Sequence, residues 1–301
     1  MTTGIGVQSD RLQLGETCFV AFQRTLRIPD DGRTYPLPPG LGRLPVRSQK
    51  GSLRHFVVPM HRREAVWLAF DAPPWHPHAV LIGLGRINAV TGNPWTDQLA
   101  GDPQNYLVCP PQLWLDGVKV GPERVRQFVA TPLGTGTTIE SQLAAGEEEG
   151  VVRIIVFEPR PGHFPDEPPP AATTTSRLQS PGAVGLGAGG QIRQRVHADP
   201  HGIAVWNPQD RAQAEIRLVG PVEFRTLTGE DAPPTPIDAS TYTEHGFPWF
   251  DVYEDSTADL QATARMEGVR SVDQIAAGES PDRSIDIPDS QITKLGRRNG
   301  G

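Results

Sequence analysis

Apolar and polar side chains alternate along several stretches in the first half of the chain. The clearest alternation runs through residues 18–28, and the segments 64–70, 78–84 and 124–131 are similarly rich in apolar residues. A period of two is typical of strands that bury one face. The pattern predicts a strand at each place, and a hairpin in which 64–70 pairs with 78–84 around the proline-rich loop 71–77.

One helix is expected in this half of the chain. Thr137 and Glu140 have the spacing of a capping box, and Ile139 and Leu143 would share a helix face. Residues 151–157 are rich in β-branched side chains and are expected to form a buried strand. The first half is therefore expected to be strand-rich with one short helix.

The composition changes abruptly after residue 158. Residues 159–190 are rich first in proline, then in threonine and serine, and finally in glycine. Such a stretch cannot build a core of its own, and a loop of this length is uncommon inside one compact domain. We interpret 159–190 as a linker or long loop between an N-terminal lobe, 1–158, and a C-terminal lobe, 191–301.

Short apolar segments and turn signals alternate in the C-terminal lobe. The segments that we expect to be strands are residues 192–197, 202–206, 214–219 and 222–227. Turns at this spacing are typical of antiparallel sandwiches and barrels. Helical turns are expected at 256–265 and 271–277, where a serine can cap each start. The predicted fold class is mainly β with minor α (α+β): two antiparallel, sandwich- or barrel-like lobes and a short C-terminal helix.

Composition and charge exclude several classes of protein. The 301 residues include 32 Gly and 31 Pro, too many for a helical bundle. The formal net charge is −7 with only three lysines, so we expect no nucleic-acid partner. No apolar stretch is long enough to span a bilayer and no secretory signal is visible, so we expect no membrane partner and a cytoplasmic location. Cys18 and Cys109 are expected to be buried thiols.

A glycine- and threonine-rich loop precedes the predicted helix. Backbone N–H groups of Gly134, Thr135, Gly136 and Thr137 would bind an anion if they pointed out of the helix start, where the helix dipole also favours negative charge. However, no lysine follows to complete a Walker A loop, and Glu140 would repel a phosphate. Simple entry into the helix is the alternative interpretation.

Histidines near acidic residues suggest metal ligation. His197, Asp199 and His201 occupy alternate positions, which on a continuous strand would share one face. The proline after Asp199 is a turn signal that would break this alternation. A second pair, His76 and His78, flanks a proline in an expected loop. We predict no cofactor, with a divalent metal at His197, Asp199 and His201 as the alternative to surface histidines.

Aromatic residues concentrate near the C-terminus, where twelve residues contain five of the 20 aromatic side chains. Such a group must either dock on the core of the protein or form an exposed patch that meets a partner. The predicted ligand- or partner-binding residues are Tyr242, His245, Phe247, Trp249, Phe250 and Tyr253. No catalytic residue is predicted, because the chain has no Gly-x-Ser-x-Gly nucleophile motif.

The expected function is a non-catalytic binding or assembly module that recognises a protein or small ligand through an aromatic-rich surface. A protein partner or self-association is the expected interaction. The alternative is a metal-dependent or phosphate-binding hydrolase or transferase.

Two blocks of the chain carry a family resemblance. One block runs from residue 64 through Ile-Asn-Ala-Val-Thr-Gly at 87–92 to 128, and the other from 199 through Thr228-Gly229 to 250. Together the blocks resemble a recurrent family of uncharacterised bacterial proteins. The resemblance implies no activity, fold or catalytic residue.

Overall fold

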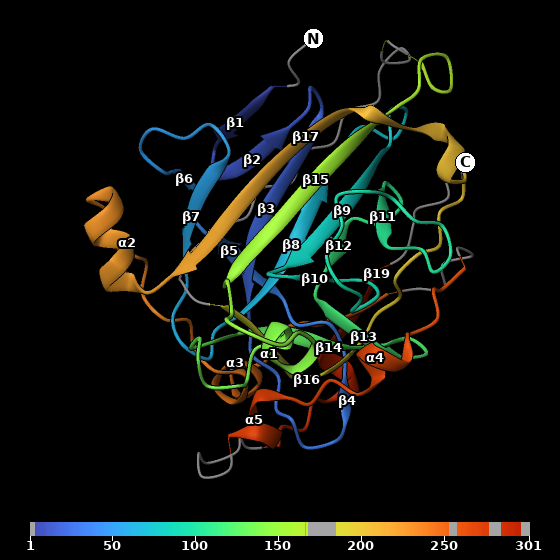
Figure 1. The fold of residues 1–301 in the computed structure, drawn as a ribbon. Helices are drawn as coiled ribbons and strands as arrows, with labels where there is room; N and C mark the ends of the chain where they lie inside the picture. The colour runs from blue at the N-terminus through green and yellow to red at the C-terminus, as the bar shows by residue number, and fades with distance from the viewer. Residues whose placement is uncertain (1–3, 166, 168–184, 253–257, 277–283, 296–301) are drawn as a thin grey trace.

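The alternating apolar pattern of the sequence corresponds to two large β-sheets that share a hydrophobic core. The structure is a computed structural model that describes residues 4–165, 167, 185–252, 258–276 and 284–295. Its helices are few and short, and most strand pairs are antiparallel (Figure 1). The predicted class, mainly β with minor α, is confirmed.

The larger sheet has ten strands in the order β1-β2-β3-β8-β14-β16-β4, with β5 paired to β3, β12 to β8 and β13 to β14. All of its pairs are antiparallel except β16 with β4. Its strands are β1 (Ile5–Gln8), β2 (Arg11–Leu14), β3 (Cys18–Thr25), β4 (Thr34–Tyr35), β5 (Gly40–Arg43), β8 (Ala65–Asp71), β12 (Trp114–Leu115), β13 (Gly117–Gly121), β14 (Arg124–Thr131) and β16 (Gly185–Arg193).

The smaller of the two large sheets has seven strands in the order β10-β9-β15-β17-β7-β6, with β11 paired to β9. Only the β17–β7 pair is parallel within it. Its strands are β6 (Arg47–Ser48), β7 (His55–Pro59), β9 (His78–Leu84), β10 (Ile87–Asn88), β11 (Tyr106–Cys109), β15 (Val151–Pro159) and β17 (Trp206–Val219).

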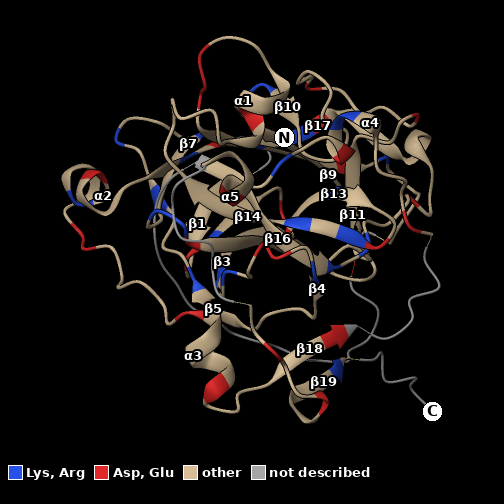
Figure 2. Ribbon diagram, turned by 90° about the horizontal axis from the view of Figure 1, so that it is seen from below, with Lys and Arg blue, Asp and Glu red and all other residues tan. Residues whose placement is uncertain are grey.

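The remaining elements lie mostly in the C-terminal third. The helices are α1 (Ile139–Leu143), α2 (Pro221–Thr228), α3 (Ala239–Glu244), α4 (Ala264–Glu267) and α5 (Val272–Ile275), with single 3₁₀ turns at Ile203–Val205 and Asp289–Gln291. Strands β18 (Trp249–Val252) and β19 (Ile292–Leu295) form a separate parallel pair, which lies beside α3 (Figure 2). Figure 2 also shows acidic and basic residues interspersed along the ribbon. No helix among the described residues is long and apolar enough to cross a membrane.

Successive side chains of a strand point to opposite faces of the sheet, so alternate residues belong to different hydrophobic clusters. On β9, Val80 and Ile82 belong to the main core, which also includes residues of β3, β8 and β14 from the other sheet. The intervening Ala79 and Leu81 face the opposite way, into a second cluster that Trp206 helps to form. A strand apolar on both faces therefore reflects a sheet that is covered on both sides.

Strands from both sides of the expected linker pair within the same sheets. β16 pairs with β14 in the ten-stranded sheet, and β17 pairs with β15 and β7 in the seven-stranded sheet. Residues 185–190, which we expected in the linker, belong to β16. Residues 166 and 168–184 lie outside the described residues. The sheets thus combine chain segments that we assigned to two lobes.

Several local expectations were wrong for identifiable reasons. The segments 64–70 and 78–84 form strands but no hairpin, because β8 and β9 belong to different sheets. Residues 222–227 form helix α2 rather than a strand: Pro221 fits the first helical turn, and left-handed Gly229 ends the helix. Residues 203–205 form a 3₁₀ turn within an expected strand.

The caps of the short helices differ from expectation at two places. The cap of α1 is Thr138, one residue later than expected, and its hydroxyl accepts from the Ser141 N–H. Helix α4 is capped by Thr263, whereas the expected cap of 256–265 lies outside the described residues. Near the expected turn 271–277, Ser271 and Gln274 form a complete capping box for α5.

Candidate metal centre

Three side chains converge at one end of the sandwich. The ligand atoms of His76, His78 and Glu158 all lie within 4.8 Å of one another, and this is the one such group of three or more His, Cys, Asp or Glu found among the described residues. The side chain of His78 is fully buried, and those of His76 and Glu158 are largely buried. The group contains two imidazoles and one carboxylate, the donor types that transition metals prefer.

Strand register explains why residues 80 positions apart meet. His78 begins β9 and Glu158 lies near the end of β15, and these strands pair antiparallel. Phe157 lies opposite Ala79, so Glu158 follows directly beside His78. Each side chain lies on the strand face that carries the main core. His76 comes from the loop 72–77, which connects β8 of one sheet to β9 of the other.

Both imidazoles approach the same carboxylate oxygen. His76 Nε2 and His78 Nδ1 each lie 3.2 Å from Glu158 Oε2. The contact of His78 Nδ1 lacks the angles of a hydrogen bond, and Glu158 Oε1 is buried without a hydrogen-bond partner. The rings are 5.1 Å apart at an interplanar angle of 61°. Three ligand atoms therefore face a common point.

The other nitrogen of each ring has its own partner. His78 Nε2 lies 2.9 Å from Thr17 Oγ1, and His76 Nδ1 lies 3.4 Å from the carbonyl oxygen of Pro165. The Pro165 carbonyl and the Glu158 carboxylate can only accept, so a neutral His76 ring donates either from Nδ1 to Pro165 or from Nε2 to Glu158 at 3.2 Å; in the first tautomer Nε2 keeps a lone pair that can bind a metal ion. In the tautomer of His78 in which Nε2 donates to Thr17, Nδ1 likewise has a lone pair that faces Glu158. Outer partners of this kind are what orients metal-binding histidines.

A positive charge stabilises these three groups when both facing ring nitrogens carry lone pairs. Two lone pairs and a carboxylate repel one another unless a proton or a metal ion lies between them. Burial raises the pKa of Glu158, but hydrogen bonding to His78 and its charge, followed by the same two effects of His76, more than offset this, so the pKa of Glu158 lies below its ordinary value. The geometry therefore fits a cation, and His78, which is fully buried, cannot obtain compensation from water.

The two cysteines lie in the nearby core but outside the ligand group. Cys18 and Cys109 are buried free thiols, as expected. Burial raises the pKa of Cys109 to about 12, and burial followed by the proximity of Cys109 and Glu158 raises the pKa of Cys18. Both thiols are therefore protonated at neutral pH in the metal-free protein, and neither belongs to the group of three converging ligands.

The structure does not bring the ligand atoms of His197, Asp199 and His201 together as a metal-binding group. The Asp199 carboxylate accepts from the Tyr106 hydroxyl at 2.6 Å, the Trp206 indole N–H at 2.9 Å and the backbone N–H of His201 at 2.7 Å. The His201 ring packs edge-on against Trp206. Asp199 is thus occupied as an acceptor for buried donors.

The Gly/Thr loop has an acidic partner from its own chain. Glu148 accepts from the backbone N–H of Gly134 and from the hydroxyl of Thr138. The Thr135 and Thr137 hydroxyls are hydrogen-bonded to each other at 2.6 Å. The predicted anion site at Gly134, Thr135, Gly136 and Thr137 therefore has a carboxylate at one of its donors.

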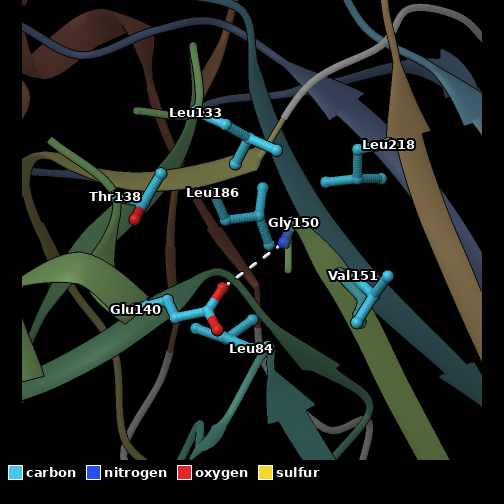
Figure 3. A pocket seen from close by; sticks show the side chains of 10 residues that line it. Leu84, Leu133, Thr138, Glu140, Gly150, Val151, Leu186 and Leu218 are labelled. Atoms are coloured by element: carbon cyan, nitrogen blue, oxygen red, sulfur yellow. Dashed lines mark hydrogen bonds between the residues drawn. The ribbon is translucent and has the colours of Figure 1, made fainter. Parts of the chain in front are cut away.

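Glu140, beside this loop, is a buried structural carboxylate (Figure 3). It accepts hydrogen bonds from the backbone and Nε of Arg86 and from the backbone N–H groups of Glu149 and Gly150. A Cβ atom at Gly85 would lie 2.0 Å from the carboxylate, so this glycine makes room for it. The adjoining cavity, about 10 Å³, holds a single water at most.

Most of the predicted aromatic surface is docked on the protein. Trp249 is fully buried and Tyr242 is 8% exposed, and the backbone of Phe250 pairs with Leu37. Phe247 is 46% exposed, and its ring lies 5.8 Å from that of His245. The sixth residue of this prediction, at position 253, is Tyr253 and lies outside the described residues.

The site has no counterpart through which a function can be transferred. No family model, curated protein or solved structure matches the chain. The chemistry of the three converging side chains is therefore the basis for a functional assignment. Sequence reasoning set the pair His76 and His78 aside and missed Glu158, since no local signal links position 158 to the loop.

Proposed function

We propose that this protein is a metalloprotein that binds one divalent transition-metal ion, preferably Zn²⁺, through His76, His78 and Glu158. The observation that carries the proposal is the convergence of two ring nitrogens on one carboxylate oxygen, with the other nitrogen of each ring on a separate oxygen partner. Two imidazoles and a carboxylate suit Zn²⁺ better than Mg²⁺ or Ca²⁺, which prefer all-oxygen sites.

The position of the group gives the ion a structural consequence. His78 and Glu158 belong to the seven-stranded sheet, whereas Thr17 directly precedes β3 of the ten-stranded sheet. His76 lies in the loop that joins the two sheets. An ion at this place would tie the loop to both sheets and stabilise the folded state in proportion to its concentration above the dissociation constant.

Calorimetric titration of the metal-stripped protein with Zn²⁺ tests the proposal. We expect one ion per chain, and loss of this binding in His76→Gln, whose side chain is partly exposed and tolerates the change. His55→Gln is the matched control, because His55 is an exposed histidine whose Nε2 lies 3.7 Å from Glu215. Equal binding by both variants and the wild-type protein would contradict the proposal.

A second candidate is recognition of a partner through the aromatic segment, supported by the exposure of Phe247 between Tyr242 and His245. An exposed ring flanked by aromatic neighbours is typical of contact residues. Phe247→Ser should abolish any self-association detected by light scattering of the wild-type protein while leaving zinc binding intact. A wild-type protein that stays monomeric and captures no protein removes this candidate.

A further inference from the structure

Among the residues that the structure describes, the candidate metal centre has three protein ligands rather than four. The group that converges among the described residues contains His76, His78 and Glu158, and neither Cys18 nor Cys109 belongs to it. Structural zinc sites are closed by four protein ligands, whereas catalytic sites bind zinc through three and keep a position for water. A tetrahedral ion held here would therefore have one position for an exogenous oxygen ligand.

The partly exposed ligands indicate where that position lies. The His78 side chain is fully buried, so the ion cannot be approached from its side. The side chains of His76 and Glu158 are 21% and 13% exposed, which leaves the open position on the side of the loop 72–77. Glu158 Oε1 is buried without a hydrogen-bond partner and can accept a hydrogen bond from a water on the ion.

We propose that this centre activates a water molecule for the hydrolysis of small neutral carboxylic esters. The inference rests on the proposed metal-binding function and extends it to a reaction. Zinc at such a site lowers the pKa of bound water to about 7, so a hydroxide nucleophile is present near neutral pH.

The reaction consumes one water for each ester. The bound water gives a proton to solvent, and the resulting hydroxide oxygen forms a bond to the ester carbonyl carbon. The bond from that carbon to the alcohol oxygen then breaks, and the alcohol oxygen takes up a proton. The products are one carboxylic acid and one alcohol, with no oxidant or further reactant.

The charges around the centre favour a neutral substrate over a phosphate ester. The recorded polar partners of the three ligands are the Thr17 hydroxyl, the Pro165 carbonyl and one another, and none is a Lys or Arg of the described chain. Enzymes that transfer phosphoryl groups place Arg, Lys or metal ions around the charged oxygens. Within the described part of the chain, none of these direct partners offers a phosphate monoester a positive charge besides that of the ion.

Hydrolysis of p-nitrophenyl acetate and p-nitrophenyl phosphate by zinc-loaded and chelator-treated protein tests the inference. We expect acetate hydrolysis roughly tenfold faster in the loaded protein than in the stripped protein or with free zinc, and no zinc-dependent phosphate hydrolysis. Glu158→Gln should lose the zinc-dependent rate, and His55→Gln should keep it, because His55 lies on the exposed end of β7.

Cobalt substitution gives a readout that does not depend on turnover. Acetohydroxamate, a chelating anion, should change the visible spectrum of the Co²⁺-loaded protein, because it occupies an open position. Zinc bound at one ion per chain without ester hydrolysis, together with an unresponsive cobalt spectrum, would overturn the inference and leave the metal-binding function standing. Absence of metal binding would overturn both.

Discussion

Two groups in this protein each contain two histidines and one carboxylate, and they differ in what occupies the carboxylate. At His76, His78 and Glu158, both rings approach one oxygen and the second oxygen lacks a partner. In the other group, Asp199 already accepts from Tyr106, Trp206 and the backbone of His201. In the first group, the two ring nitrogens and a Glu158 oxygen face a common point where an ion could bind. In the second group, the Asp199 carboxylate already accepts hydrogen bonds from buried donors.

The comparison shows that ligand types and regular sequence spacing do not by themselves bring ligand atoms together. His197, Asp199 and His201 have the more regular spacing, yet Asp199 stabilises the aromatic cluster around Trp206. The two groups also differ in the contacts around their side chains. Thr17 and Pro165 bind the outward ring nitrogens of the first group, so its remaining nitrogens point at the acid.

The largest expected effect is on zinc affinity. His76→Gln removes a ligand and should raise the dissociation constant about a thousandfold, roughly 4 kcal/mol, in a competition titration with a coloured chelator. The double variant His197→Gln/His201→Gln should bind zinc within about twofold of the wild-type protein. The reverse ranking of the two variants would move the metal site to the second group.

The next largest expected effect is on the free energy of unfolding, and it follows from a substitution of Asp199 in the second group. Asp199→Ala leaves the Tyr106 hydroxyl and the Trp206 indole N–H, both on residues 1% exposed, without their acceptor. The free energy of unfolding should fall by about 3 kcal/mol in urea denaturation. His201→Gln keeps the carboxylate and serves as control. An unaffected Asp199→Ala protein would show that these hydrogen bonds contribute little.

A third carboxylate, that of Glu64, should make the stability of the protein depend on pH. Burial raises its pKa from 4.5 to about 7, even though Arg24 forms a buried ion pair with it. The folded protein therefore holds a proton that the unfolded chain has released, so stability falls as pH rises from about 5 to about 7, by about 2 kcal/mol.

Glu64→Gln should remove this part of the pH dependence of unfolding, measured by urea denaturation at several pH values. Glu16→Gln, at an exposed position, is the matched control and should keep the wild-type slope. A Glu64→Gln protein with the wild-type slope would show that Glu64 ionises normally in the folded state.

The smallest effect tests the contact between Thr17 and His78. Thr17→Val removes the oxygen that faces His78 Nε2, so the ring loses its orientation and zinc affinity should fall about tenfold. Thr17→Ser retains a hydroxyl and should bind zinc nearly as well as the wild-type protein. Equal affinities for the Val and Ser variants would show that Thr17 does not position His78.

Local patterns predicted many strands but not their partners. Strand β14 has the limits expected from apolar periodicity, and the expected strand 78–84 coincides with β9. The same patterns suggested a hairpin of β8 and β9, because adjacent strands usually pair, whereas the loop between them crosses from one sheet to the other. The segment 222–227 was misassigned because its apolar residues also suit a helix flanked by proline and glycine.

The sequence pointed to only part of the candidate metal centre. His76 and His78 are close together in the chain, but the proline between them suggested an exposed loop rather than a pair of ligands. Glu158 enters through the pairing of β9 with β15, which depends on long-range register. A carboxylate brought in by sheet pairing has no local sequence signal, so only the folded structure reveals it.

Anomalous X-ray diffraction at the zinc absorption edge, from crystals grown with Zn²⁺, measures the central claim directly. The account predicts one strong anomalous peak within bonding distance, about 2 Å, of His76 Nε2, His78 Nδ1 and Glu158. No peak at these atoms in crystals of protein saturated with zinc, or a peak at His197 and His201 instead, would contradict it.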